Sequence, residues 1–395
     1  MDSKNSKQDS FSFWRYGENT MEPVGPIGII TQQLDKDFAA DINRHLRRKR
    51  QAYIKDYPEL REHSGYLRTD YSIAVDTQRF STGEGRAKLI DDVRGHDIYI
   101  ITDVLNDAAY MKRGQQYISL SPDDHYHDLL RIINAIQGTC SRINVIMPFL
   151  REGRRYLRQS RESTDCALML RQLFSMGISN FITYDAHDSR VDNAVPRYNF
   201  ENFPTASEII AKVLETVPDI NLSSEGFMVS SPSETTIRRA VYYASLMKVP
   251  LSTFYSVKEP DGSFVRGFLG DDVSGKDIFI VDDMLDKIDL LISCAKYLKE
   301  KGAKRVFAIC TFALIDDGYL DFADACDLGI IDKIFATNLT RIPRFLQDKE
   351  WFVPVDMSYN IASAIDALNH NASLNDLLNS DTKIKGLLDN HKAQV

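Results

Sequence analysis

Two stretches of the chain repeat the same order of polar and apolar positions at a spacing of 180 residues, over 93–103 and again over 273–283. Each stretch begins with a glycine-containing turn and an aspartate, continues through β-branched and aromatic residues, and ends on a carboxylate. A short apolar run that follows a turn signal is typical of a buried strand. We therefore expect a buried strand in each stretch and interpret the pair as an internal repeat.

The repeat continues into a helix and a second strand in each half. Amphipathic helices are expected to start near Asp128 and near Asp289, and the second strands to lie at 142–147 and 305–310. Apolar strands joined by helical crossovers indicate parallel strands covered on both faces. The predicted fold class is α/β, with two domains of mostly parallel sheet related by internal duplication. Ligands of such sheets bind beyond the carboxyl ends of the strands.

The remaining pattern supplies the outer elements and the domain limits. Residues 163–176 have the apolar spacing of a helix, residues 181–184 read as a strand, and residues 351–378 read as a return strand and a closing helix. Periodic pattern is lost between Asn193 and Pro204, where we place the boundary. The predicted division is a polar extension over 1–24, an N-terminal domain over 25–198, a C-terminal domain over 199–378 and a polar tail over 379–395.

The composition of the 395 residues, 43% hydrophobic and 26% charged, is typical of a globular protein with two domains. The N-terminal residues are polar and no apolar run reaches the roughly 18 residues of a membrane span, so we expect neither secretion nor membrane insertion. A net charge of −8 argues against a general nucleic-acid surface, because such a surface needs clustered cations.

The five cysteines are scattered and form no C-x-x-C pair. We interpret them as core thiols of a reduced, cytoplasmic compartment, rather than as a metal or redox site. The basic cluster from Arg44 to Arg50 is expected at the end of a solvated helix.

Candidate chemistry follows the strands. The segment 184–188 places His187 between two acids directly after a strand. A loop histidine is most often solvated or capping, yet a neutral imidazole with a carboxylate neighbour is also a good metal ligand. The segment 147–162 carries a run of arginines, which is either a solvated face or, because Gly153 makes it a loop and arginine forks suit phosphate, a phosphate site.

Two further constellations involve carboxylates. In residues 79–85 two glycines around Glu84 permit a tight turn that holds a carboxylate near an aromatic ring, although a plain hairpin turn explains them equally. Asp282 and Asp283 end the most strongly apolar strand. Carboxylates at such a place are costly unless they bind a cation or polar groups, such as sugar hydroxyls or a magnesium-bound phosphate.

Taken in this order over residues 25–375, these elements resemble the ribose-phosphate pyrophosphokinase family. The resemblance implies two phosphoribosyltransferase-like domains, a magnesium cofactor, a dimer-based oligomer, and transfer of the diphosphate of ATP to carbon 1 of ribose 5-phosphate. It assigns ATP binding to Phe80, Thr82, Glu84, Arg154, Arg155 and His187, with His187 also near the metal. It assigns ribose-phosphate binding to Asp282, Asp283, Asp286 and Lys287.

The pentose side departs from the family first at its phosphate turn. In the family the acids lead into small residues whose bare N–H groups cradle the 5-phosphate at a helix N-terminus. Here Asp286 is followed by Lys287, Ile288 and Asp289. Ile288 provides no close backbone approach and Asp289 would repel phosphate.

Two more departures concern single groups. Ser233 stands in place of a family aspartate, which leaves Glu234 as the candidate for a metal-related role. Ser256 stands in place of the lysine that stabilises charge on the transferred diphosphate, which leaves Lys258 as the candidate catalytic residue.

These departures favour a catalytically weak or inactive ATP-binding paralogue that regulates or scaffolds an active synthetase, as a homo-oligomer or as a hetero-oligomer with it. The alternative is an active ribose-phosphate diphosphokinase that uses the replacement residues. A phosphoribosyltransferase fits less well, because such proteins normally have one domain of this kind and also need the altered phosphate turn.

Overall fold

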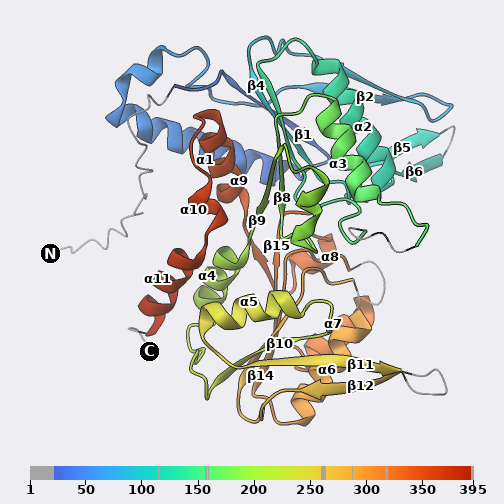
Figure 1. Cartoon of the computed structure of the whole chain (residues 1–395), viewed down its shortest axis with the longest axis vertical. Helices are drawn as coiled ribbons and strands as arrows, with labels where there is room; N and C mark the ends of the chain where they lie inside the picture. The colour runs from blue at the N-terminus through green and yellow to red at the C-terminus, as the bar shows by residue number, and fades with distance from the viewer. Residues whose placement is uncertain are drawn as a thin grey trace.

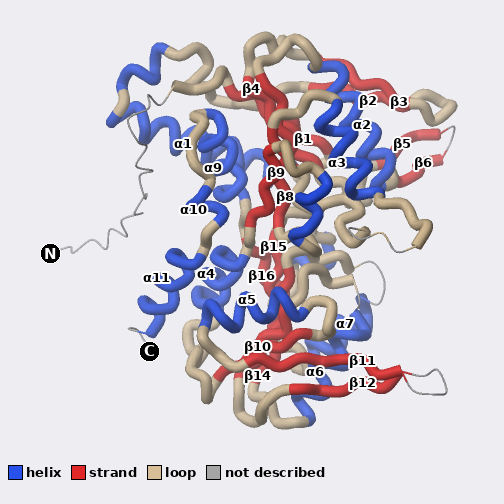
Figure 2. Tube along the Cα trace, viewed as in Figure 1, coloured by secondary structure: helices blue, strands red, loops and turns tan. Residues whose placement is uncertain are grey.

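The computed structural model describes residues 22–113, 116–155, 158, 160–258, 264–286, 288–315 and 319–392. The chain forms two lobes, each built on its own sheet, which lie one above the other in Figure 1. The first lobe is blue to green and most of the second is yellow to orange, while the C-terminal helices run along the side of both. Helices lie on both sides of the strands (Figure 2), as expected for an α/β fold.

The first lobe has a five-stranded sheet in which all paired strands are parallel. Its strands in spatial order are β1 (Ile27–Gln32), β4 (Asp97–Thr102), β7 (Arg142–Ile146), β8 (Asn180–Tyr184) and β9 (Asn199–Phe203). Its helical elements are α1 (Lys36–Asp56), η1 (Pro58–Glu62), α2 (Pro122–Ile136), α3 (Asp165–Ser175) and η2 (Ser189–Ala194). Two hairpins project from this lobe, β2 (Val75–Arg79) with β3 (Gly85–Leu89), and β5 (Tyr110–Arg113) with β6 (Gln116–Ser119).

The second lobe has a seven-stranded sheet in which β12 alone pairs antiparallel. Its strands in spatial order are β12 (Phe264–Leu269), β11 (Leu251–Lys258), β10 (Phe227–Ser231), β13 (Asp277–Val281), β14 (Arg305–Cys310), β15 (Lys333–Thr337) and β16 (Phe352–Val355). The helices that follow β9 in the described part of the sequence are α4 (Ala206–Thr216), α5 (Ile237–Met247), α6 (Ile288–Glu300), α7 (Tyr319–Asp327), α8 (Arg344–Gln347), α9 (Ser358–Asn369), α10 (Asn375–Leu378) and α11 (Asp381–Lys392).

The internal repeat is confirmed in both lobes. The repeated stretches form β4 and β13, the crossovers form α2 and α6, and the second strands form β7 and β14. The predicted fold class, two domains of mostly parallel sheet, is therefore correct. Helix α2 begins before Asp128, at Pro122, because Ser121 and Asp124 form a capping box.

The repeat extends to its buried charges. Asp97 opens β4, and its Oδ2 lies 2.8 Å from Nη2 of Arg142 at the start of β7. Asp277 opens β13 in the same way, with its Oδ2 2.7 Å from Nη2 of Arg305 at the start of β14. Each aspartate is almost fully buried, and paired burial is the condition under which a charge is tolerated inside a protein.

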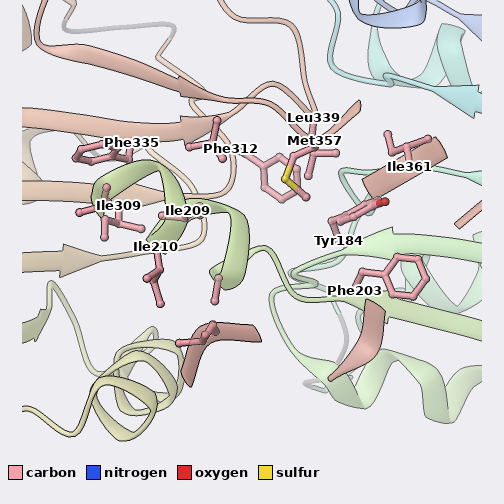
Figure 3. Packing of buried hydrophobic residues seen from close by; sticks show 14 of the residues in the cluster. Tyr184, Phe203, Ile209, Ile210, Ile309, Phe312, Phe335, Leu339, Met357 and Ile361 are labelled. Atoms are coloured by element: carbon pink, nitrogen blue, oxygen red, sulfur yellow. The ribbon is translucent and has the colours of Figure 1, made fainter. Parts of the chain in front are cut away.

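One of the hydrophobic clusters spans both lobes, and each lobe also has a cluster of its own. A single cluster of buried side chains contains Tyr184 and Phe203 from the first sheet together with Phe312, Leu339 and Met357 from loops of the second lobe. Figure 3 shows these side chains converging between the lobes. The predicted boundary near residue 198 stays a prediction, and β9, which follows it, pairs with β8 in the first sheet.

Helix α9 packs on α1, across the lobes, and this contact corrects one prediction. Arg50 does not lie at a solvated helix end, because α1 continues to Asp56 and the side chain of Arg50 is 0% exposed. Its Nη2 donates to Oδ1 of Asn369 at 2.5 Å, and its guanidinium lies 4.2 Å from the ring centre of Tyr66.

The tail after Ser380, expected only as polar sequence, contains helix α11. Ile384 and Leu388 lie one helical turn apart and are buried, and α11 packs on α4 and α5. Because so few side chains of α11 are buried, the rest of its sequence is polar and does not stand out as a helix that packs on the protein.

Candidate functional site

A pocket of about 490 Å³ lies between the lobes, at the carboxyl ends of the central strands. This is the expected ligand position for parallel sheets, and the volume is that of a small-molecule site. The loops after β4, β7 and β8 of the first lobe and after β13 and β14 of the second contribute to it. The lining residues used below are Arg154, Arg155, Asp185, His187, Met284 and Asp286.

His187, which lines the pocket, contacts the buried Asp283 of the second lobe. Nδ1 of His187, in the loop after β8, donates to Oδ2 of Asp283, in the loop after β13, at 2.6 Å. The family resemblance assigns His187 to ATP binding and Asp283 to ribose-phosphate binding. The structure therefore brings the two predicted half-sites into direct contact.

Arg154 makes a second contact across the pocket. Its Nη2 donates to Oδ2 of Asp286 at 2.5 Å and also contacts the sulfur of Met284. Arg155 lines the same pocket, is mostly exposed, and lies 4.0 Å from Glu162. Arg154 is thus an available cation whose charge is balanced by a carboxylate of the opposite half-site.

The adjacent carboxylates of Asp282 and Asp283 titrate in opposite directions. Burial, with the hydrogen bond and charge of Asp283, raises the pKa of Asp282 well above its usual range. Burial opposes ionisation of Asp283 too, but the hydrogen bond from His187 and the charge of Arg239 hold the pKa of Asp283 well below its usual value. The opposite shifts mean that Asp283 favours its ionised form and Asp282 its protonated form.

A network missed in the sequence surrounds Asp185, the residue that follows β8. Its carboxylate accepts hydrogen bonds from the hydroxyls of Thr205 and Thr311, at 2.5 and 2.6 Å. Nη1 of Arg239, from the first turn of α5, lies 2.7 Å from Oδ1 of Asp185. No sequence motif links these four residues. The available signal was a pair of arginines, Arg238 and Arg239, in the first turn of a mostly apolar helix.

The predicted ATP residues of the 79–85 turn lie outside the pocket lining. They form the tip between β2 and β3, where Phe80 N–H donates to the carbonyl of Glu84 and the Thr82 hydroxyl donates to Oε2 of Glu84, both at 2.8 Å. The hairpin alternative is confirmed as local structure. Phe80 is 49% exposed, and the role of these residues in ATP binding stays a prediction.

The replacement residues are only partly described. Glu234 lies exposed in the turn before α5. Lys258 is the last residue of β11, but its side chain lies outside the described part of the structure, as does the whole of Lys287. Their predicted roles stay predictions.

Two carboxylates near the pocket could serve as ligands of a magnesium ion. Within the described ranges no group of three or more His, Cys, Asp or Glu side chains is placed to hold a metal ion. Magnesium commonly takes one or two carboxylates and completes its shell with phosphate oxygens and water. Asp282 and Asp283 offer such carboxylates, whereas Nδ1 of His187 is already bonded to Asp283.

The cysteines fit the prediction of core thiols. Cys166, Cys294, Cys310 and Cys326 are buried and Cys140 is partly buried. Burial raises the pKa of the Cys166 and Cys294 thiols to about 12, which disfavours a reactive thiolate. In the part of the chain that is described, no helix is both long and apolar enough to cross a membrane.

Two family models match the chain. Residues 27–177 match the N-terminal domain of ribose phosphate pyrophosphokinase, and residues 235–379 match the phosphoribosyl synthetase-associated domain. Among curated proteins, the ribose-phosphate pyrophosphokinase of Thermosipho africanus is 26% identical over 312 residues, which cover 77% of this chain and 87% of that protein. The Staphylococcus epidermidis ribose-phosphate pyrophosphokinase is 27% identical over 243 residues, covering 60% of this chain and 69% of that protein.

The fold is also shared with a solved structure. The phosphoribosylpyrophosphate synthetase of Mycobacterium smegmatis superposes with a TM-score of 0.68 at 18% sequence identity, covering 88% of this chain and 100% of that one. At this identity the likeness concerns the fold, and the two-lobe arrangement is common to both chains.

Proposed function

Because the chain belongs to the ribose-phosphate pyrophosphokinase family, we propose that it is an ATP-binding paralogue with weak or absent synthetase activity. In this proposal the pocket between the lobes binds ATP with magnesium. The protein then regulates or scaffolds an active synthetase in the cytoplasm, as a partner in a hetero-oligomer or as a homo-oligomer beside it.

The turn between β13 and α6 carries this proposal. A 5-phosphate site at a helix N-terminus needs exposed N–H groups and no competing anion. Here α6 starts at Ile288, whose side chain is 5% exposed and packs in the core, and Asp289 places a carboxylate in the first turn. Asp286, one residue before the undescribed Lys287, accepts a hydrogen bond from Arg154 and so forms an ion pair with it.

The turn before α5 supports the same conclusion. Ser233 replaces a family aspartate. Its hydroxyl oxygen is hydrogen-bonded to the hydroxyl of Thr235 at 2.8 Å and lies 3.3 Å from the hydroxyl of Thr236. The Ser231 hydroxyl donates to the carbonyl of Ser233 at 2.6 Å. These hydroxyls bond to one another, so within residues 231–236 only the exposed Glu234 offers an anionic oxygen for a metal.

One observation favours the alternative, an active ribose-phosphate diphosphokinase. The acids Asp282 and Asp283 remain at the end of β13. Their buried pair, with His187 on one side, keeps the groups that could bind sugar hydroxyls or a cation. Activity would then depend on Lys258, Lys287 and Glu234 as replacements.

The deciding experiment measures AMP release and ligand binding on the same protein. Purified chain at high concentration, with ATP, magnesium and ribose 5-phosphate, is expected to release little or no AMP. Calorimetry is expected to show ATP binding without measurable ribose 5-phosphate binding. Rapid AMP release, or tight binding of the pentose phosphate, would refute the proposal.

A gain-of-function variant tests the cause. Installing Lys at Ser256, Asp at Ser233 and a Thr-Gly-Gly-Thr turn at 287–290 is expected to raise AMP release. Replacing buried Ile288 by glycine removes core packing and costs about 2 to 5 kcal/mol, so unfolding must be measured in parallel.

A further inference from the structure

We infer that Asp185 and Arg239 are positioning residues that hold His187 against Asp283 and so join the two lobes into one ligand site. The inference rests on the proposed function in that it takes His187 to contact the nucleotide. It does not depend on whether the chain turns over.

The carboxylate of Asp185 ties together elements of both lobes. Asp185 follows β8 of the first sheet, whereas Thr311 follows β14 and Arg239 lies on α5 of the second lobe. Both Asp185 oxygens are engaged, since Oδ1 pairs with Arg239 while Oδ2 accepts from Thr205 and Thr311. The Asp185 carbonyl also accepts from Nη2 of Arg239 at 3.0 Å.

The backbone at this point is held in an uncommon conformation. Asp185 has a φ of +43°, in the left-handed region that costs a non-glycine residue about 1 kcal/mol or more. The surrounding contacts fix it there. They include the next residue, because Ala186 N–H donates to Oδ1 of Asn202 at 2.9 Å.

Thr205 shows which interaction prevails locally. It stands at the N-cap of α4, a position where a threonine hydroxyl commonly accepts from the helix N-terminus. Its side chain makes no such cap and donates to Asp185 instead. The network around Asp185 therefore takes precedence over capping of α4.

Arg239 links the network to the acids of the second lobe. Its side chain is 15% exposed and its direct partner is Asp185, while its charge also acts on Asp282 and Asp283. Burial opposes the charge on Arg239, but Asp185 and Asp283 raise its pKa above the usual value, so it stays a cation.

The connection to His187 is short. Only Ala186, itself pinned by Asn202, separates Asp185 from His187. A shift of Asp185 would therefore move the imidazole away from Asp283, to which it is bonded at 2.6 Å. Catalytic and binding groups lose function on displacements of about 1 Å.

The chain offers a matched control at the opposite ends of its strands. Asp277 and Arg305 form an ion pair of the same kind, with Nε and Nη2 of Arg305 at 2.8 and 2.7 Å from the Asp277 carboxylate. Asp277 is buried, begins β13, and does not line the pocket. Its neutralisation tests what the loss of a buried ion pair does to stability alone.

The test combines calorimetry with ¹⁵N NMR of histidine-labelled protein, in which the His187 signal is assigned with His187→Gln. In Asp185→Asn and Arg239→Gln we expect the His187 Nδ1 shift to lose its hydrogen-bonded character and ATP affinity to fall about tenfold. Arg239→Lys keeps the charge but not both contacts, and is expected to lie between. Asp277→Asn should lower thermal stability without changing either signal.

An unchanged His187 signal in folded Asp185→Asn and Arg239→Gln would overturn the inference, and so would an equal change in Asp277→Asn. If Asp185→Asn does not fold, the His187 Nδ1 shift and the ATP affinity of Arg239→Lys decide the question. Failure of the proposed function would be seen in a different measurement, namely AMP release by the unmodified chain.

Discussion

Neutralising Asp286 is expected to strengthen ATP binding. The carboxylate of Asp286 lies 2.5 Å from the guanidinium of Arg154, the cation predicted to hold the ATP phosphates. Any phosphate bound by Arg154 would therefore lie within roughly 5 Å of a like charge. Asp286→Asn keeps the shape of the side chain and removes this repulsion.

The magnitude follows from Coulomb's law. At roughly 5 Å, two unit charges repel by about 3 kcal/mol at an effective dielectric constant of about 20 and by about 0.8 kcal/mol in water. Arg154 and Asp286 are 44% and 29% exposed, which places the pair toward the screened end. A gain of about 1 kcal/mol corresponds to about fivefold tighter binding.

Calorimetric titration of Mg-ATP at low and high salt measures this gain. The increase should shrink as salt rises, because the two groups are partly exposed. Asp219→Asn is the matched control, since Asp219 pairs with Arg305 at 3.0 Å outside the pocket lining and should leave ATP affinity unchanged. If Asp286→Asn left ATP affinity unaltered or weaker, Arg154 would not be the phosphate ligand.

Two further predictions concern stability. Arg50→Ala is expected to cost about 3 to 5 kcal/mol of unfolding free energy in urea titration, because it removes a buried cation that bonds to Asn369 and lies 3.7 Å from the buried Asp366, and a loss below about 1 kcal/mol would contradict the contact with α9. Burial raises the pKa of Asp103 to about 6, so the folded state binds this proton more tightly than the unfolded chain does. Its contribution to stability is full below about pH 4 and is lost as the pH rises through about 6, and Asp103→Asn should flatten the stability profile in that window.

The sequence predicted those parts of the fold that show a clear pattern of apolar and polar residues. Strands β4 and β13, which lie within 93–103 and 273–283, are fully buried, so their apolar runs were unambiguous. The fate of Arg50 was not predictable, because its partners Asn369 and Asp366 lie more than 300 residues away in sequence. Helix α11 was missed because its buried stripe is narrow.

The residues of the candidate site likewise fall into those that a sequence pattern indicates and those that it does not. His187, Arg154 and the acid pair could be singled out as candidates because each follows a recognisable strand, and strand ends converge in a parallel sheet. Arg239 was missed because it comes from a helix, and nothing in the local pattern states which loop it will meet. The contact between His187 and Asp283 likewise depends on the placement of one lobe on the other.

The packing of α9 on α1 has a consequence for how the chain is made. During translation, α1 emerges about 300 residues ahead of the helix that covers it, which at 5 to 20 residues per second is an interval of roughly 15 to 60 s. Through that interval the face of α1 that carries Arg50 has no Asn369 to bond. Until α9 has been made, the nascent first lobe therefore lacks the helix that covers this face of α1.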